Sequence, residues 1–185
     1  MCDQLAPQYT MKIKQSILPL VALLSFLNCH FINAEETPPL KIEAGEEWKV
    51  EFMNEEGVNF FTINQKVGGD GQMMISRWPV PGGVEQIASS MQLIVNSFIE
   101  VAKENPNLQL KEKKAKIENI KGVEIEGEVA IFELKLGIFQ TMFMFHDGIQ
   151  TWNGQFTGSK EDWVKAKKVI EQITKTPGIE APKSE

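Results

Sequence analysis

The sequence is poor in the residues that carry covalent and metal chemistry. Its 185 residues include two cysteines and two histidines. Both cysteines, Cys2 and Cys29, precede Ala34, so a chain cleaved after Ala34 has no cysteine. Such a chain contains no disulfide, no thiolate nucleophile and no cysteine-ligated zinc site. We therefore expect no bound metal and no cofactor.

The sequence also lacks a basic excess. Lysine and arginine number 19 against 25 aspartates and glutamates, which gives a net charge of −6. A protein that coats a nucleic acid duplex needs positive charge to neutralise phosphates, so this balance excludes that class. The content of 42% apolar and 24% charged residues is typical of an ordinary globular protein.

The N-terminal region has the layout of a secretory signal peptide. Two lysines precede an apolar stretch over residues 17–27, and the small residue Ala34 follows it. The stretch is too short to span about 30 Å of hydrocarbon comfortably. We predict cleavage after Ala34, so that residues 1–34 form the signal peptide. The mature protein is then exported, and we expect it to be periplasmic or extracellular.

Several further expectations depend on this segment. The natural start is expected at Met11, directly before the basic Lys12 and Lys14. An uncleaved signal would hold the protein at a membrane, and so would a lipid on Cys29. Phe-Leu-Asn precedes Cys29, where a lipidation motif has small residues, so the lipid is the weaker alternative. Otherwise we expect no membrane contact, no nucleic acid and a monomer.

The rest of the chain has the length of one domain. Residues 35–44 and 176–185 are polar and contain prolines, which predicts a flexible linker and a flexible C-terminal tail. Residues 45–175 contain no internal repeat and no low-complexity tract. A chain of this size buries roughly 70% of its unfolded surface, which is enough to fold without disulfides.

Two segments have the apolar spacing of amphipathic helices. Over residues 84–104 apolar side chains recur at intervals of three and four, which predicts one buried face. Asn105-Pro106 ends this helix. A second helix is predicted over residues 161–175, with Ser159 as its N-cap.

The other segments are typical of β-strands. Residues 139–145 place methionines on one face and phenylalanines on the other, which predicts a central strand buried on both faces. Asp147-Gly148 predicts a tight hairpin turn, and another turn is predicted at 119–122. Strands are predicted at 48–53, 58–66, 72–78, 108–116, 123–133, 138–146 and 149–157. The expected fold is a single α+β domain in which helices cover an antiparallel sheet, an α/β/α sandwich.

The polar motifs do not form a recognisable catalytic or metal set. His146-Asp147 holds a metal only if further ligands converge, and no other histidine follows Ala34. A serine triad would have to recruit the same histidine. The run Gly68-Gly69-Asp70-Gly71 lacks the Lys-Ser/Thr of a P-loop and the acidic ligands of an EF-hand. We interpret both motifs as turns.

Two further groups of residues allow a chemical reading and a structural one. Glu124, Glu126 and Glu128 would suit acid–base chemistry, but their alternation is typical of a solvated strand face. Met142 and Met144 are of the type that ligates copper, but they lie among phenylalanines and favour core packing. We predict no catalytic residue and no metal ligand.

The strongest candidates for a binding contact are Arg77, Trp78 and Trp152. Arg77 is the single arginine of the sequence and stands beside Trp78 at the end of a predicted strand. Arginine and tryptophan are enriched at binding hot spots, where they stack and pair with carboxylates. Trp152, between two polar residues, is a second candidate surface aromatic. The alternative is that the arginine lies on the surface and both tryptophans pack in the core.

The order of these features resembles the PsbP-like domains, which include the bacterial DcrB envelope proteins. The resemblance covers residues 45–175 and rests on the Gly-Glu-Glu-Trp opening at 45–48 and the closing segments at 143–148, 151–152 and 161–163. It implies a sheet between helices and an accessory protein that binds larger partners. It implies no shared catalytic residues.

These observations lead to one expected function and two alternatives. We expect a non-enzymatic accessory or binding protein of the periplasm or cell envelope that acts through protein–protein contacts. The first alternative is a carrier or sensor for a small, partly apolar ligand held between sheet and helix. The remote alternative is a carboxylate-based hydrolase, which requires acidic groups to converge in a cleft.

Overall fold

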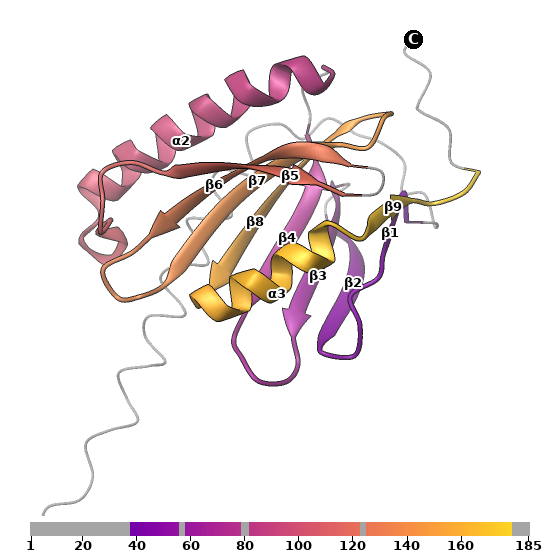
Figure 1. Ribbon diagram of the computed structural model, residues 1–185, viewed down its shortest axis with the longest axis horizontal. Helices are drawn as coiled ribbons and strands as arrows, with labels where there is room; N and C mark the ends of the chain where they lie inside the picture. The colour runs from indigo at the N-terminus through magenta and orange to yellow at the C-terminus, as the bar shows by residue number, and fades with distance from the viewer. Residues whose placement is uncertain (1–37, 56–57, 79–81, 123–124, 179–185) are drawn as a thin grey trace, which may run out of the picture. The chain divides into compact units, whose positions relative to one another are not determined.

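The computed structural model describes residues 38–55, 58–78, 82–122 and 125–178. All of them belong to the unit Ala34–Glu185. The predicted signal peptide lies outside the described residues, as does the predicted tail after residue 178. Figure 1 shows one large sheet with a long helix, α2, on one side and a shorter helix, α3, on the other.

The described residues form a sheet of seven strands in which every neighbouring pair is antiparallel. Strands β2 to β4 form one meander and β5 to β8 form another, and the two meanders join where β4 pairs with β8. The spatial order is β2 (Trp48–Glu55), β3 (Val58–Gln65), β4 (Gln72–Arg77), β8 (Thr151–Gly158), β7 (Phe139–His146), β6 (Glu126–Glu133) and β5 (Lys116–Lys121).

Helix α2 (Ile87–Glu104) follows a short 3-10 turn, η2 (Val84–Gln86), and covers one face of the sheet. The predicted helix is confirmed, because its buried residues recur with helical spacing and the helix ends before Pro106. It contacts β6 and β7, where its apolar face meets a small cluster of buried residues. That cluster comprises Ile87, Met91, Val95, Phe98, Ala130, Phe132, Met142 and Met144.

Helix α3 (Lys160–Ile170) covers the opposite face. Ser159 caps it as predicted: its hydroxyl accepts from the Asp162 amide at 3.1 Å, and the Asp162 carboxylate accepts from the Ser159 amide at 3.3 Å. Phe143 and Phe145 pack on this side of β7, whereas Met142 and Met144 pack under α2. The prediction of a central strand buried on both faces is therefore confirmed.

The second helix ends earlier than predicted. Its buried stripe stops at Ile170, and the predicted final turns instead form the short strand β9 (Ile173–Lys175). Strand β9 pairs with β1 (Leu40–Ile42), which lies in the segment predicted to be a flexible linker. The linker prediction is wrong for these residues. Leu40 is buried against the α3 side of the sheet, and no local pattern reveals a partner more than 130 positions away.

One strand boundary also differs from the prediction. The segment 108–116 is predicted to be a strand, but the 3-10 turn η3 (Pro106–Leu108) ends at its first residue, and exposed charged residues follow. Strand β5 begins at Lys116 and continues to Lys121, so it occupies most of the turn predicted at 119–122. The burial of Ile120 against the sheet outweighs the local turn signal. The described chain is thus an α+β domain with a large antiparallel sheet and two helices.

Candidate functional site

Asp147 organises the hairpin between β7 and β8. Its side chain is buried, with 3% of the residue exposed. Oδ1 accepts from the amides of Ile149 and Gln150, both at 2.8 Å, and Oδ2 accepts from the Trp152 indole at 2.8 Å. A carboxylate that accepts three hydrogen bonds inside the protein is well satisfied and holds the turn.

His146 contributes to the same turn. Its Nδ1 accepts from the Gly148 amide at 2.9 Å, which places the proton of a neutral ring on Nε2. Gly148 has a φ of 86°, and the Asp147 amide donates to the Gln150 carbonyl at 3.2 Å, so the turn centres on Gly148 and Ile149, one residue later than predicted. The His146-Asp147 motif thus builds a turn, as its structural interpretation proposed. Within the described ranges, no group of three metal-ligating side chains converges.

Trp152 is not a surface aromatic. Only 2% of the residue is exposed, and its ring lies edge-on to Phe61 at 6.3 Å between centroids. Its one polar atom is satisfied by buried Asp147. The predicted partner contact at Trp152 is therefore corrected: the indole is part of the core, because its ring and its N–H both have interior partners.

The glycine-rich run at 68–71 packs against the start of α3. A Cβ on Gly69 would collide with the Asp162 carboxylate and with the Gln65 side chain. The Gln65 backbone amide donates to the Gly71 carbonyl at 2.9 Å, which closes the turn between β3 and β4. The glycines allow the turn to approach the helix N-terminus closely, so packing explains this motif.

The methionines considered as copper ligands and two of the glutamates considered for acid–base chemistry lie on strands of the sheet. Met142 and Met144 are 6% and 0% exposed under α2. Glu126 is exposed and Glu128 half-buried on the same strand, β6, whereas Glu124 lies outside the described residues. Their burial places the two methionines in the hydrophobic core.

Arg77 and Trp78 do not form one contact. They are consecutive in extended chain, so their side chains point to opposite faces of the sheet. Arg77 is exposed and stands opposite Trp152, on the α3 side. Trp78 is half-buried on the α2 side, where its backbone amide donates to the Thr151 carbonyl at 2.9 Å. Arg77 can therefore contribute only to a surface on the α3 side, and Trp78 only to one on the α2 side.

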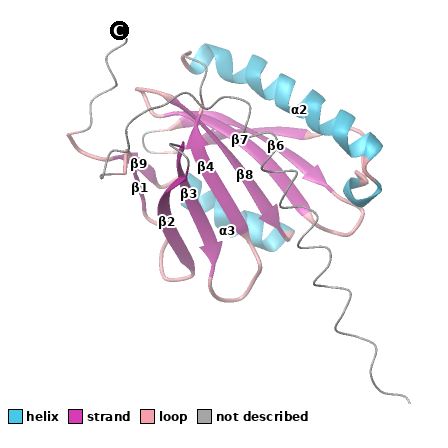
Figure 2. Cartoon of the chain, turned by 180° about the vertical axis from the view of Figure 1, so that it is seen from behind, coloured by secondary structure: helices cyan, strands magenta, loops and turns pink. Residues whose placement is uncertain are grey.

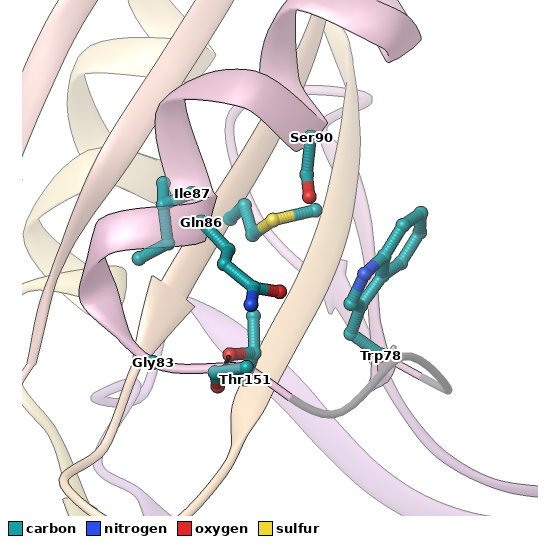
Figure 3. A pocket seen from close by; sticks show the side chains of 8 residues that line it. Trp78, Gly83, Gln86, Ile87, Ser90 and Thr151 are labelled. Atoms are coloured by element: carbon teal, nitrogen blue, oxygen red, sulfur yellow. Dashed lines mark hydrogen bonds between the residues drawn. The ribbon is translucent and has the colours of Figure 1, made fainter.

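Trp78 borders a shallow depression at the start of α2. Figure 3 shows its indole beside the helix, opposite Gln86 and Ser90. The space amounts to about 160 Å³ with open solvent included, so it does not enclose a small molecule. Its lining consists of Trp78, Gly82, Gly83, Gln86, Ile87, Ser90, Met144 and Thr151.

The larger feature on this side is a part of the sheet that α2 leaves uncovered. Figure 2 shows β3, β4 and β8 with no helix in front of them, beside α2. Directly opposed side chains form three rows across these strands. The rows are Phe60–Ser76–Asn153, Thr62–Met74–Gln155 and Asn64–Gln72–Thr157. No position in this uncovered sheet face is charged.

Hydrogen bonds within the uncovered sheet face use only part of its polar groups. Ser76 donates to Asn153 Oδ1 at 2.9 Å, and Thr157 donates to Gln140 Oε1 at 2.7 Å. Gln140 on β7 stands opposite Thr157 and so extends the third row toward α2. It is 2% exposed, and its buried Nε2 has no partner among the described atoms. Amides and hydroxyls both donate and accept, so this surface can pair with polar groups of a partner.

The outer face of α2 shares this lack of charge. From Ile87 to Ile99 the helix has no charged residue, although half of its circumference faces solvent. Leu93 is 69% exposed at its centre. The exposed positions, which we call the outer face of α2, are Ala88, Ser89, Gln92, Leu93, Asn96 and Ser97. A solvated helix face ordinarily carries charges, so their absence here is informative.

The uncovered sheet face and the outer face of α2 adjoin each other, and we call them together the neutral surface. Sequence reasoning missed it, although the charge-free stretch of α2 was visible. Charged residues lie at its border, where Lys49 and Glu51 on the edge strand β2 pair at 2.7 Å. In the part of the chain that the structure describes, no helix is long and apolar enough to cross a membrane.

No family model matches the chain, and no curated protein matches it. The fold and the neutral surface are therefore the basis for assigning a function.

Proposed function

We propose that the protein is an exported, non-enzymatic accessory protein that acts through protein–protein contacts made by its neutral surface. The observation that carries the proposal is the absence of charge over adjoining parts of a helix and a sheet, in a chain of which 24% is charged. Exposed surface without charge is typical of the central part of protein interfaces, where lysine, aspartate and glutamate are depleted.

The composition of the neutral surface supports this function. Phe60, Met74 and Leu93 supply apolar area, and Trp78 stands at one end of the sheet rows. Aromatic residues and methionine are enriched at interface centres, and methionine adapts its shape to a partner. The amides and hydroxyls between them supply hydrogen bonds for the same contact. The shallow depression beside Trp78 extends this surface.

Two expectations from the sequence complete the proposal. The predicted signal peptide supports a location in the periplasm or outside the cell. The resemblance to PsbP-like domains supports an accessory role, and an antiparallel sheet between helices on opposite faces is compatible with that family. We propose membership of this family on that basis.

Site-specific photo-crosslinking tests the function. A photoreactive residue at Gln155, within the uncovered sheet face, should capture a defined protein when the full chain is exported in its own cells. The same probe at Ile117, which is 47% exposed on β5 outside the neutral surface, is the matched control. Capture at Gln155 that is lost in Met74→Lys supports the proposal. Equal capture at both sites, or none at Gln155 in correctly folded protein, contradicts it.

A further inference from the structure

The neutral surface has two complementary halves, and this observation identifies one partner. Helix α2 covers β6 and β7 but leaves β3, β4 and β8 uncovered on the same face. We propose that a second copy of this chain covers these strands, so that the outer face of α2 in each copy packs on the uncovered sheet face of the other. This inference rests on the proposed function of the neutral surface and names a partner for it.

The dimensions of the uncovered sheet face suit a helix. Three neighbouring strands span about 10 Å between the outer two, and a helix with its side chains is about 10–12 Å wide. A helix packs on a neighbouring element at about 10 Å, and α2 already packs in this way on β6 and β7. A second helix beside α2 would therefore complete the layer that α2 begins.

A single two-fold axis allows both helix-on-sheet contacts to form at the same time. With the axis parallel to α2 and along the border between α2 and the uncovered strands, each helix lies over the other copy's β3, β4 and β8. The two α2 helices are then neighbours between two sheets. Ser90 and Ile94 lie one turn apart on α2, and Ser90 faces the Trp78 side, toward the uncovered strands. A small residue there allows the two helices to approach closely.

The chemistry of the two halves matches. Leu93, the most exposed large apolar residue in the described chain, needs apolar partners, and Met74 lies in the central row of the sheet face. Gln92 and Asn96 project from the helix, whereas Asn153 and Gln155 project from the sheet, and amides pair with amides. A symmetric contact repeats each of these pairs on both sides of the axis.

The absence of charged residues from this contact limits the electrostatic cost of pairing two copies. Two copies with a net charge of −6 each repel one another, and a contact without charged residues adds no further like-charge pair. Each helix-on-sheet contact covers about 20 Å by 10 Å, so two such contacts bury about 800 Å² on both copies together. That area is at the lower end of specific interfaces, so we expect a reversible dimer.

Sedimentation velocity of the exported full chain tests the inference. We expect a monomer–dimer equilibrium at concentrations up to roughly 200 μM, a range that includes the Kd values of weak specific pairs. Leu93→Lys and Met74→Glu, each alone, should give monomers, because each places an unpaired charge inside the contact. Mixing the two variants should restore a dimer, since the introduced lysine of one copy then meets the introduced glutamate of the other. Ile117→Lys, an exposed apolar position on β5, should leave the equilibrium unchanged.

Several outcomes would overturn the dimer. These are a monomer over the whole range, a dimer that tolerates Leu93→Lys, or variant mixtures that stay monomeric although circular dichroism shows native folding of each variant. The test also separates the two proposals. A monomer whose crosslinked partner is still lost in Met74→Lys removes the dimer and retains the accessory function. A dimer that behaves as expected, without any captured foreign protein, removes the accessory function and retains the dimer.

Discussion

The Trp152 indole donates a hydrogen bond of 2.8 Å to Oδ2 of Asp147, and both side chains are almost completely buried. The bond joins the turn between β7 and β8 to the core on the α3 side of the sheet. The other carboxylate oxygen accepts two backbone amides of the same turn. One side chain therefore connects the local geometry of a hairpin to the packing of the domain.

Asp147→Ala should destabilise the domain strongly. The substitution removes three acceptor contacts and leaves the Trp152 N–H buried without a partner, which costs about 3 kcal/mol. Urea unfolding followed by tryptophan fluorescence measures the loss. In a double-mutant cycle with Trp152→Phe, the two losses should be clearly less than additive. Full additivity would show that the hydrogen bond contributes nothing.

Val95→Asp should unfold or aggregate the domain. Val95 is 6% exposed between α2 and the sheet, and an unpaired buried charge costs about 3–5 kcal/mol. The melting temperature measured by circular dichroism should fall sharply. Gln92→Asp, an exposed position one turn earlier on the same helix, is the control and should change the melting temperature little at low protein concentration. Equal losses for both variants would contradict the assigned buried face.

Gly154→Ala should disturb the centre of the sheet. A Cβ at this position on β8 would collide with the ring of Phe143 on β7, which stands directly opposite. Overpacking of this kind costs about 1–3 kcal/mol. Phe143→Leu should create space, so the double variant is expected to recover part of the stability lost by Gly154→Ala. Chemical denaturation of all four proteins measures this coupling, and its absence would argue against the collision.

Glu118 should make stability depend on pH. Hydrogen bonds from Lys116 and from Lys167, the latter at 3.2 Å, hold its pKa below the ordinary value of 4.5. A carboxyl whose pKa is lowered by folding stabilises the folded state above its unfolded pKa. This contribution disappears as the pH falls through the folded pKa. At neutral pH the free energy of unfolding should therefore be larger for wild type than for Glu118→Gln.

The pH titration supplies the control for this prediction. Measured from about pH 7 to about pH 3, the difference between wild type and Glu118→Gln should shrink to a small residual value at the acid end. Glu112→Gln, which alters an exposed glutamate in the loop before β5, should show a smaller difference at neutral pH. A constant difference for Glu118→Gln at all pH values would mean that its charge is not the cause.

Local pattern predicted the elements whose formation depends on neighbours in sequence. The helical spacing over 84–104, the Ser159 cap and the two-sided burial of β7 are all present in the structure. The turn character of His146-Asp147 was predicted as well, because Asp-Gly favours the backbone conformation that a hairpin needs. Period-two alternation also implies that Arg77 and Trp78 point to opposite faces of the sheet.

Long-range pairing was outside the reach of local pattern. Strand β1 depends on β9 across more than 130 residues, and β5 depends on β6 to bury Ile120. Trp152 alternates with polar neighbours and so resembled a surface residue. It is in the core because a whole sheet face, including Phe61 on a distant strand, packs around it.

The sequence by itself determined a domain with no thiol chemistry after Ala34, a net negative charge and two amphipathic helices. Only the tertiary structure decided that β4 pairs with β8, and this pairing places uncharged residues of three strands in common rows. It also decided that α2 lies on β6 and β7 and leaves those rows uncovered. The physical reason is that composition and periodicity are local properties, whereas a surface consists of side chains that only folding brings together.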